Sequence, residues 1–128
     1  MDHTIVHFEI PANDVEKLKE FYSKLFGWKI EKSSGPGPEY WLIGTVPVDD
    51  KRTPLRPGVN GGMYKKQRSE NKPVNYISVE SIDKSIELVK ALGGKIVQGK
   101  QEVMGVGWVA IALNPEGKPI AMMQPMRI

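Results

Sequence analysis

Cysteine is absent from the sequence. Its absence excludes disulfide bonds, thiolate metal ligands and a cysteine nucleophile, and it suits a reducing compartment, so we expect a cytoplasmic protein. Long apolar runs are also missing, since no window approaches the roughly 18 consecutive apolar residues that a membrane-spanning helix needs. The N-terminus lacks the basic segment and apolar run of a secretory signal. We therefore expect no association with a membrane.

The net charge of the chain is small. The chain has 18 Lys and Arg against 15 Asp and Glu, a net charge of +3. The densest basic stretch, KKQRSENK at residues 65–72, contains no aromatic residue. Nucleic-acid grooves combine basic residues with aromatic side chains that stack on bases. We interpret this stretch as a solvated loop and expect no nucleic-acid partner.

The length and composition are those of an ordinary globular protein. The chain has 128 residues, of which 40% are hydrophobic and 26% charged. This length is sufficient for one hydrophobic core, and the composition is typical of soluble domains. We expect a single domain over residues 1–128.

The first apolar segment, TIVHFEI at residues 4–10, alternates in character. Val6, Phe8 and Ile10 are apolar, whereas His7 and Glu9 between them are polar. A period of two residues indicates a half-buried strand whose side chains point alternately to its two faces. We expect the apolar set to pack on a helix, so that His7 and Glu9 point to the opposite face.

A helix should follow this strand. Asn13 is the expected N-cap, with Glu16 three residues later as in a capping box, and Gly27 is well placed to end the helix. An apolar stripe at helical spacing consists of Val15, Leu18, Tyr22 and Leu25.

The order of elements is then repeated. Further strands of the first half are expected at 28–32, 40–46 and 59–66. The second half should contain a strand at 74–79, a short helix carrying Ile82, Ile86 and Val89, and strands at 95–98, 107–114 and 118–125. An internal repeat of this kind predicts two βαβββ modules, module one at about 4–66 and module two at about 73–126.

Several sequence words occur in one characteristic order. They are HFEIPAND, EFYSKLFGW, YWLIG, VNGGM, VESIDKS, LGGKI and NPEGKPIAMMQP. With these words the chain resembles the vicinal oxygen chelate superfamily, which includes glyoxalase I, extradiol dioxygenases and the bleomycin and fosfomycin resistance proteins. The resemblance implies an α+β fold in which paired βαβββ modules form an open half-barrel cavity. It also implies a homodimer whose interface helps to build the site.

In metal-using members of this superfamily, four cavity-facing positions carry His or Glu ligands. The resemblance assigns the first to His7, or to Ile5 when the count starts from the end of the strand. The other three fall on Gly61 or Gly62, on Val74 or Tyr76, and on Ala121. Zinc and nickel sites need three or four converging nitrogen or oxygen ligands. We therefore expect no divalent metal and no other cofactor.

The remaining cavity wall is predicted by alternation. In the strand at 107–114, one alternating set consists of two small residues, Ala110 and Ala112, and the indole of Trp108, and it should face the cavity. The bulkier alternate set should face a helix. The sequence does not fix the facing of Trp28, Tyr40 and Trp41. The predicted ligand-binding cavity consists of His7, Glu9, Tyr76, Ser78, Trp108, Ala121 and Met123. Such an apolar, aromatic pocket suits a small organic molecule.

Three hypotheses about function stay open. The protein could bind or sequester a small organic or aromatic molecule, as bleomycin resistance proteins do, without the usual metal ligands. It could instead be a lyase or isomerase of glyoxalase type in which His7 and Glu9 transfer a proton beside a carbonyl, with or without a weakly held metal. It could also be a structural or regulatory dimer with a vestigial cavity. The alternative interpretation of His7 itself is a neutral imidazole held by one hydrogen bond, with no functional role.

Overall fold

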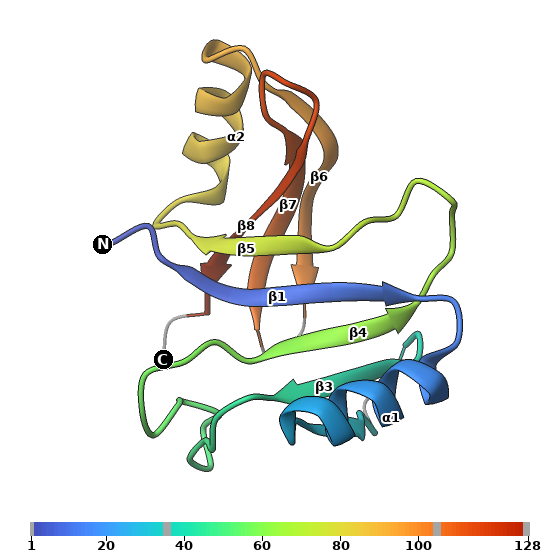
Figure 1. Cartoon of the computed structure of the whole chain (residues 1–128). Coiled ribbons are helices and arrows are strands. Elements are labelled where there is room, and N and C mark those ends of the chain that lie inside the picture. Colours follow the sequence, from blue (N-terminus) through green and yellow to red (C-terminus); the bar gives the residue numbers. More distant parts are fainter. Residues whose placement is uncertain (1, 35–36, 104–105, 127–128) are drawn as a thin grey trace. The chain divides into compact units, whose positions relative to one another are not determined.

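A computed structural model describes residues 2–34, 37–103 and 106–126, and the other positions of the predicted domain lie outside the described residues. Strand, helix and three strands occur twice in succession in the described ranges (Figure 1). The elements are β1 (Ile5–Ala12), α1 (Val15–Phe26), β2 (Lys29–Lys32), β3 (Tyr40–Gly44), β4 (Gly61–Lys65), β5 (Val74–Ser78), α2 (Ile82–Ala91), β6 (Lys95–Val103), β7 (Gly107–Leu113) and β8 (Pro119–Pro125). This order confirms the predicted α+β class of paired βαβββ modules.

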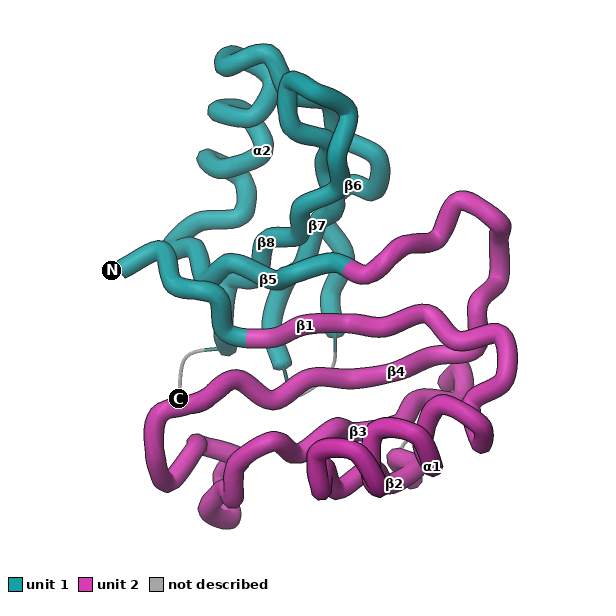
Figure 2. The backbone as a smooth tube through the Cα atoms, in the orientation of Figure 1, with its two compact units in different colours: residues 1–6, 74–128 teal, residues 7–73 magenta. Residues whose placement is uncertain are grey.

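The chain divides into two compact units (Figure 2). Unit 2 consists of His7–Pro73, and unit 1 consists of Met1–Val6 together with Val74–Ile128. The first residues belong with the second half of the chain because they bond to β5. The Ser78 N–H donates to the Thr4 carbonyl at 2.9 Å, and His3 Nδ1 lies 3.2 Å from the Ser78 carbonyl oxygen.

Unit 2 is a four-stranded sheet in the order β2-β3-β4-β1. The pairs β2·β3 and β3·β4 are antiparallel, and β4·β1 is parallel. α1 covers one face of this sheet. The buried cluster beneath it consists of Ala12, Val15, Ile30, Trp41, Ile43 and Met63. Phe8 and Ile10 pack against this cluster as the alternation predicts, whereas Val6, the third member of that set, lies in unit 1 and is exposed.

The ends of α1 differ slightly from those that the sequence predicts. The N-cap is Asp14, not Asn13, and its side chain accepts a hydrogen bond from the Lys17 N–H at 3.1 Å. The cap lies one residue later because β1 continues through Ala12 before the chain turns. Gly27 ends the helix as predicted, with a left-handed φ of 73° that glycine adopts without steric cost.

Unit 1 contains four further strands of the sheet, in the order β5-β8-β7-β6. β5 and β8 are parallel, and the two later pairs are antiparallel. α2 covers one face of this sheet, over a cluster of Val79, Ile82, Ala110, Ala112 and Met122. β6 is longer than the predicted 95–98, because register shifts around Gln98 and Gln101 keep its polar second half paired with β7. Within the described part of the chain, no helix combines the length and apolar character that a bilayer crossing demands.

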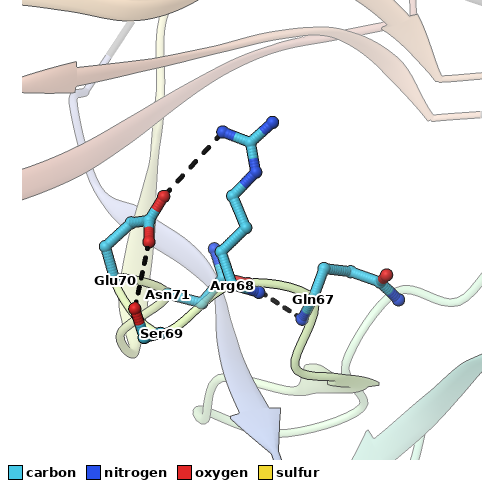
Figure 3. Close-up of polar contacts among 5 residues, drawn as sticks. All are labelled: Gln67, Arg68, Ser69, Glu70 and Asn71. Atoms are coloured by element: carbon cyan, nitrogen blue, oxygen red, sulfur yellow. Dashed lines mark hydrogen bonds and ion pairs between the residues drawn. The ribbon is translucent and has the colours of Figure 1, made fainter.

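The basic stretch at 65–72 forms a turn between β4 and β5 (Figure 3). The side chain of Asn71 closes it by accepting hydrogen bonds from the N–H groups of Gln67 and Arg68, at 3.1 and 3.0 Å. Glu70 lies 3.9 Å from the Arg68 guanidinium and accepts a hydrogen bond from Ser69. These residues are mostly exposed, so the stretch has the solvated loop character that its composition indicates.

Candidate functional site

The site is built on the face of the unit 2 sheet that points away from α1. His7 and Glu9 lie on this face of β1, and both are half-buried. Tyr40, the first residue of β3, lies between them. Its hydroxyl is 2.9 Å from His7 Nε2, and it donates a hydrogen bond to Glu9 Oε2 at 2.9 Å. A continuous chain of hydrogen bonds therefore links the imidazole, the phenol and the carboxylate.

Gly62 provides the space for this arrangement. In the register of the sheet, Gly62 pairs with Glu9 on one side and with Leu42 on the other. A Cβ on Gly62 would overlap with the hydroxyl and ring of Tyr40. Gly61 faces the other way, since a Cβ there would meet the carbonyl and ring of Phe8 on the α1 side. Of the two glycines that the sequence leaves open, Gly62 is the one on the His7 face.

Hydrogen-bond chemistry fixes the proton positions in this chain. The Tyr40 hydroxyl has one proton, which it donates to Glu9, so it must accept the bond from His7. His7 therefore carries a proton on Nε2. Burial lowers the pKa of His7 from 6.5 to about 4, because desolvation disfavours the imidazolium. At neutral pH His7 is thus the neutral Nε2–H tautomer.

A second tyrosine, Tyr64, lies beside this group. It is the direct cross-strand partner of Tyr40 and also pairs with Pro11 of β1, two residues after Glu9. Burial and, to a smaller extent, the negative charge of Glu9 raise the pKa of Tyr64, so its phenol is neutral over the ordinary pH range. Tyr64 thus shares one face of the sheet with His7, Glu9 and Tyr40. We call these four residues the Glu9 site.

The positions that the resemblance assigns to metal ligands do not fit a divalent cation. Gly62 has no ligating side chain, and the ring of Tyr40 fills the space above it. In unit 1 the position on β5 is either Val74 or Tyr76, an isopropyl group or a phenol, and the position on β8 is the methyl group of Ala121, the direct partner of Tyr76. Among the residues that the structure describes, no three His, Asp or Glu side chains gather where they could hold a metal ion.

Four of the predicted cavity residues share one face of the unit 1 sheet. Tyr76 and Ser78 of β5 pair with Ala121 and Met123 of β8. Tyr76 and Ser78 are each 7% exposed, and Ala121 is fully buried. Met123 lies on the same face as Ala121, as the sequence predicts. This face is apolar, and its cluster also contains Val74, Val109 and Ile111.

The predicted facing of Trp108 is wrong. In the β7·β8 register, Val109 pairs with Met123 and Ile111 with Ala121, so the bulky set shares the face of Ala121. Trp108 packs instead against the cluster beneath α2, where Lys100 Nζ lies 4.5 Å from the centre of its ring. The prediction is wrong because the small side chains of β7 lie beneath α2 and do not form a cavity wall.

Small residues in β7 have a different purpose. Ala110 and Ala112 are completely buried beneath α2. Alanine at these two positions lets the helix backbone approach the strand closely, and the helix needs this because its own apolar side chains fill the remaining space.

The three aromatic residues of undetermined facing lie in different places. Trp41 is buried beneath α1, and Trp28 stacks on Tyr22 with ring centres 5.1 Å apart. Tyr40 alone among the three bonds to His7 and Glu9. Alternation in YWLIG separates Tyr40 from Trp41, but the sequence contains no signal for which of the two faces α1.

Two shallow surface hollows lie away from these residues, on the exposed sides of the helices. One on α1 is lined by Lys17, Glu20, Phe21, Lys24 and Leu25. The other on α2 is lined by Asp83, Lys84, Glu87 and Leu88. Neither contains a residue of the Glu9 site, and neither brings together groups with evident chemistry.

Comparison with known proteins identifies the superfamily of the chain. A family model described as Glyoxalase/Bleomycin resistance protein/Dioxygenase superfamily matches residues 4–122. A glyoxylase-like domain-containing protein of Didymella fabae is 35% identical over 92 residues, which cover 68% of this chain and 66% of that protein. The anthracycline biosynthesis protein DnrV of Streptomyces peucetius is 24% identical over 123 residues, which cover 90% of this chain and 44% of DnrV. This chain thus spans only part of the length of either relative.

A solved structure shows the same fold. Methylmalonyl-CoA epimerase from Mycobacterium tuberculosis superposes with a TM-score of 0.65, over 96% of this chain and 88% of the epimerase. The two sequences are 12% identical. At this identity the similarity concerns the fold and carries no statement about activity.

Proposed function

The chain belongs to the glyoxalase/bleomycin resistance protein/dioxygenase superfamily, and within it we propose a protein that binds a small organic molecule at the Glu9 site. The observation that carries the proposal is the bonded chain from His7 through Tyr40 to Glu9. Fixed polar groups beside apolar surface are the usual basis of small-molecule recognition. Leu42 and Pro11 supply apolar surface on the same face, by their register with Gly62 and Tyr64.

Binding is favoured over proton transfer by the state of His7. A general base works best when its pKa lies near the working pH. Burial lowers the pKa of His7 to about 4, so the imidazole is a weak base. Its Nε2 proton is also already directed at Tyr40. His7 is therefore better suited to orienting the phenol than to removing a proton from a substrate.

In this proposal no divalent metal takes part. The donor atoms at the corresponding positions of unit 2 are reduced to one imidazole, because Gly62 supplies none and Tyr40 covers it. The homodimer and the cytoplasmic location remain predictions, the first from the resemblance and the second from the absence of cysteine.

A thermal-shift screen of wild-type protein against neutral, cationic and anionic aromatic compounds tests the proposal. A compound at a hundredfold excess over its Kd adds about 2.7 kcal/mol to the free energy of unfolding. We expect hits whose shift in Tm is reduced by Tyr40→Phe and Glu9→Gln. Glu31→Gln is the matched control, because Glu31 lies on the same face, through its register with Leu42, and pairs with Lys29.

Two results would contradict the proposal. In the first, no compound of the library raises the Tm of wild-type protein. In the second, hits convert to products at a rate that His7→Gln abolishes while their affinity stays unchanged, which would favour the lyase or isomerase hypothesis.

A further inference from the structure

The protons of the Glu9 site can be followed from one side chain to the next. His7 donates its Nε2 proton to the Tyr40 hydroxyl, and Tyr40 donates its own proton to Glu9, each over 2.9 Å. A neutral imidazole has a single N–H, a phenol has a single O–H, and a carboxylate only accepts. The donors of His7 and Tyr40 are therefore engaged within the site.

Tyr64 differs from these residues, because its hydroxyl has no hydrogen-bond partner among the described residues. It follows Met63, which is completely buried beneath α1, so alternation turns Tyr64 to the opposite face, beside its cross-strand partner Tyr40. The side chain is half-buried. Burial and the charge of Glu9 raise its pKa, so the phenol keeps its proton. Tyr64 thus presents one accessible O–H donor.

Apolar surface lies next to this donor. Pro11 is the partner of Tyr64 on β1, and Leu42 pairs with Gly62 on the same face of the sheet. A ligand that covers this surface also removes the Tyr64 hydroxyl from water. If the ligand has no acceptor, a donor is left unpaired, which is costly, whereas a ligand with an acceptor atom replaces the lost water. A site with such a donor discriminates strongly between the two kinds of ligand.

We propose that Tyr64 determines the specificity of the Glu9 site by donating its hydroxyl proton to an acceptor oxygen, of the ketone or amide kind, on an otherwise apolar ligand. The inference rests on the proposed function and names its ligand class. The chain from His7 through Tyr40 to Glu9 then has a separate purpose, because it fixes the polar wall beside which the ligand lies.

Two probes of nearly equal shape test the inference. Acetophenone carries a carbonyl oxygen where α-methylstyrene carries a methylene group. Kd values for both follow from NMR titration of the full chain at pH 7. We expect Tyr64→Phe to weaken acetophenone binding about three- to tenfold, the loss of one hydrogen bond, and to leave α-methylstyrene within about twofold. Comparing each probe with itself across the mutation cancels their difference in hydrophobicity.

Tyr22→Phe is the matched control. The Tyr22 hydroxyl also has no hydrogen-bond partner among the described residues, but Tyr22 packs with α1 on the other side of the unit 2 sheet. We expect this variant to leave both Kd values unchanged. Infrared spectroscopy of bound acetophenone with a labelled carbonyl adds a direct measurement. A hydrogen bond lowers the carbonyl stretching frequency, so the frequency should rise in Tyr64→Phe, which a purely structural role of Tyr64 would not produce.

The two proposals fail in different ways. If Tyr64→Phe weakens both probes equally, or changes neither the acetophenone Kd nor its carbonyl frequency, the inference about Tyr64 is wrong and small-molecule binding still stands. The same holds if library compounds bind at the Glu9 site but acetophenone does not. If neither probe and no library compound binds, both proposals are wrong.

Discussion

The ring of Tyr40 lies over Gly62, in the space that any other residue at position 62 would fill with its own side chain. The relationship joins two strands, β3 and β4, and brings the phenol to His7 and Glu9 on β1. The missing side chain at Gly62 and the hydrogen bonds of the phenol therefore depend on each other, because the hydroxyl of Tyr40 occupies the space that a Cβ would take.

Gly62→Ala tests this dependence. The added methyl group would overlap with the Tyr40 hydroxyl and ring, so Tyr40 must leave its bonds to His7 and Glu9. We expect the free energy of unfolding to fall by about 1–3 kcal/mol, the usual cost of overpacking, as measured by urea denaturation. Gly99→Ala is the control, because a Cβ on that exposed β6 glycine would meet nothing within 4 Å. Equal stability of the two variants would show that Tyr40 does not need the space.

Tyr40→Phe removes the hydroxyl and keeps the ring. His7 and Glu9 then each lose a hydrogen-bond partner while half-buried. We expect a loss of about 1–2 kcal/mol in the free energy of unfolding. Tyr22→Phe serves as the control, since the Tyr22 hydroxyl has no hydrogen-bond partner among the described residues. A loss no larger than that of the control would mean that water replaces the Tyr40 hydroxyl at little cost.

The elements of the fold were largely predictable from local patterns. Alternation around His7 and the helical stripe that begins at Val15 each have one consistent period. The second half of the chain repeats the same order of elements, which supports the prediction for each half. β6 beyond residue 98 was missed because its residues are polar and exposed. That segment is a strand through its hydrogen bonds to β7, which no local pattern of apolar residues encodes.

The site was predictable only in part. His7 and Glu9 follow from the alternation of one strand, but Tyr40 joins them through the register of β3 against β4 and the absence of a side chain at Gly62. Strand register depends on pairing between distant segments. The error at Trp108 has a related cause, because side-chain size within one strand does not say which face the helix covers.

Ala112→Leu tests the corrected facing of β7. Ala112 is fully buried in the cluster beneath α2, so a larger side chain must push the helix away from the sheet. We expect a loss of about 1–3 kcal/mol or more in the free energy of unfolding, measured by thermal or urea denaturation. Val97→Leu on β6, at a side chain that is 61% exposed, should change it by less than about 0.5 kcal/mol. If Ala112→Leu is equally harmless, α2 does not pack closely on this strand.

The depressed pKa of His7 predicts how stability changes with pH. The folded state holds His7 neutral down to a pKa of about 4, whereas the unfolded chain protonates it near 6.5. Between these values the unfolded state binds more protons, so stability is fully present above pH 6.5 and falls as the pH drops toward 4. The slope from this residue is at most about 1.4 kcal/mol per pH unit. His7→Gln, which retains an N–H donor for Tyr40, should flatten the profile in this window, and His3→Gln should not. Urea denaturation of both variants at intervals between pH 4 and 7 measures the free energy of unfolding as a function of pH. If His7→Gln leaves the slope of this profile unchanged, His7 is protonated in the folded protein as readily as in the unfolded chain.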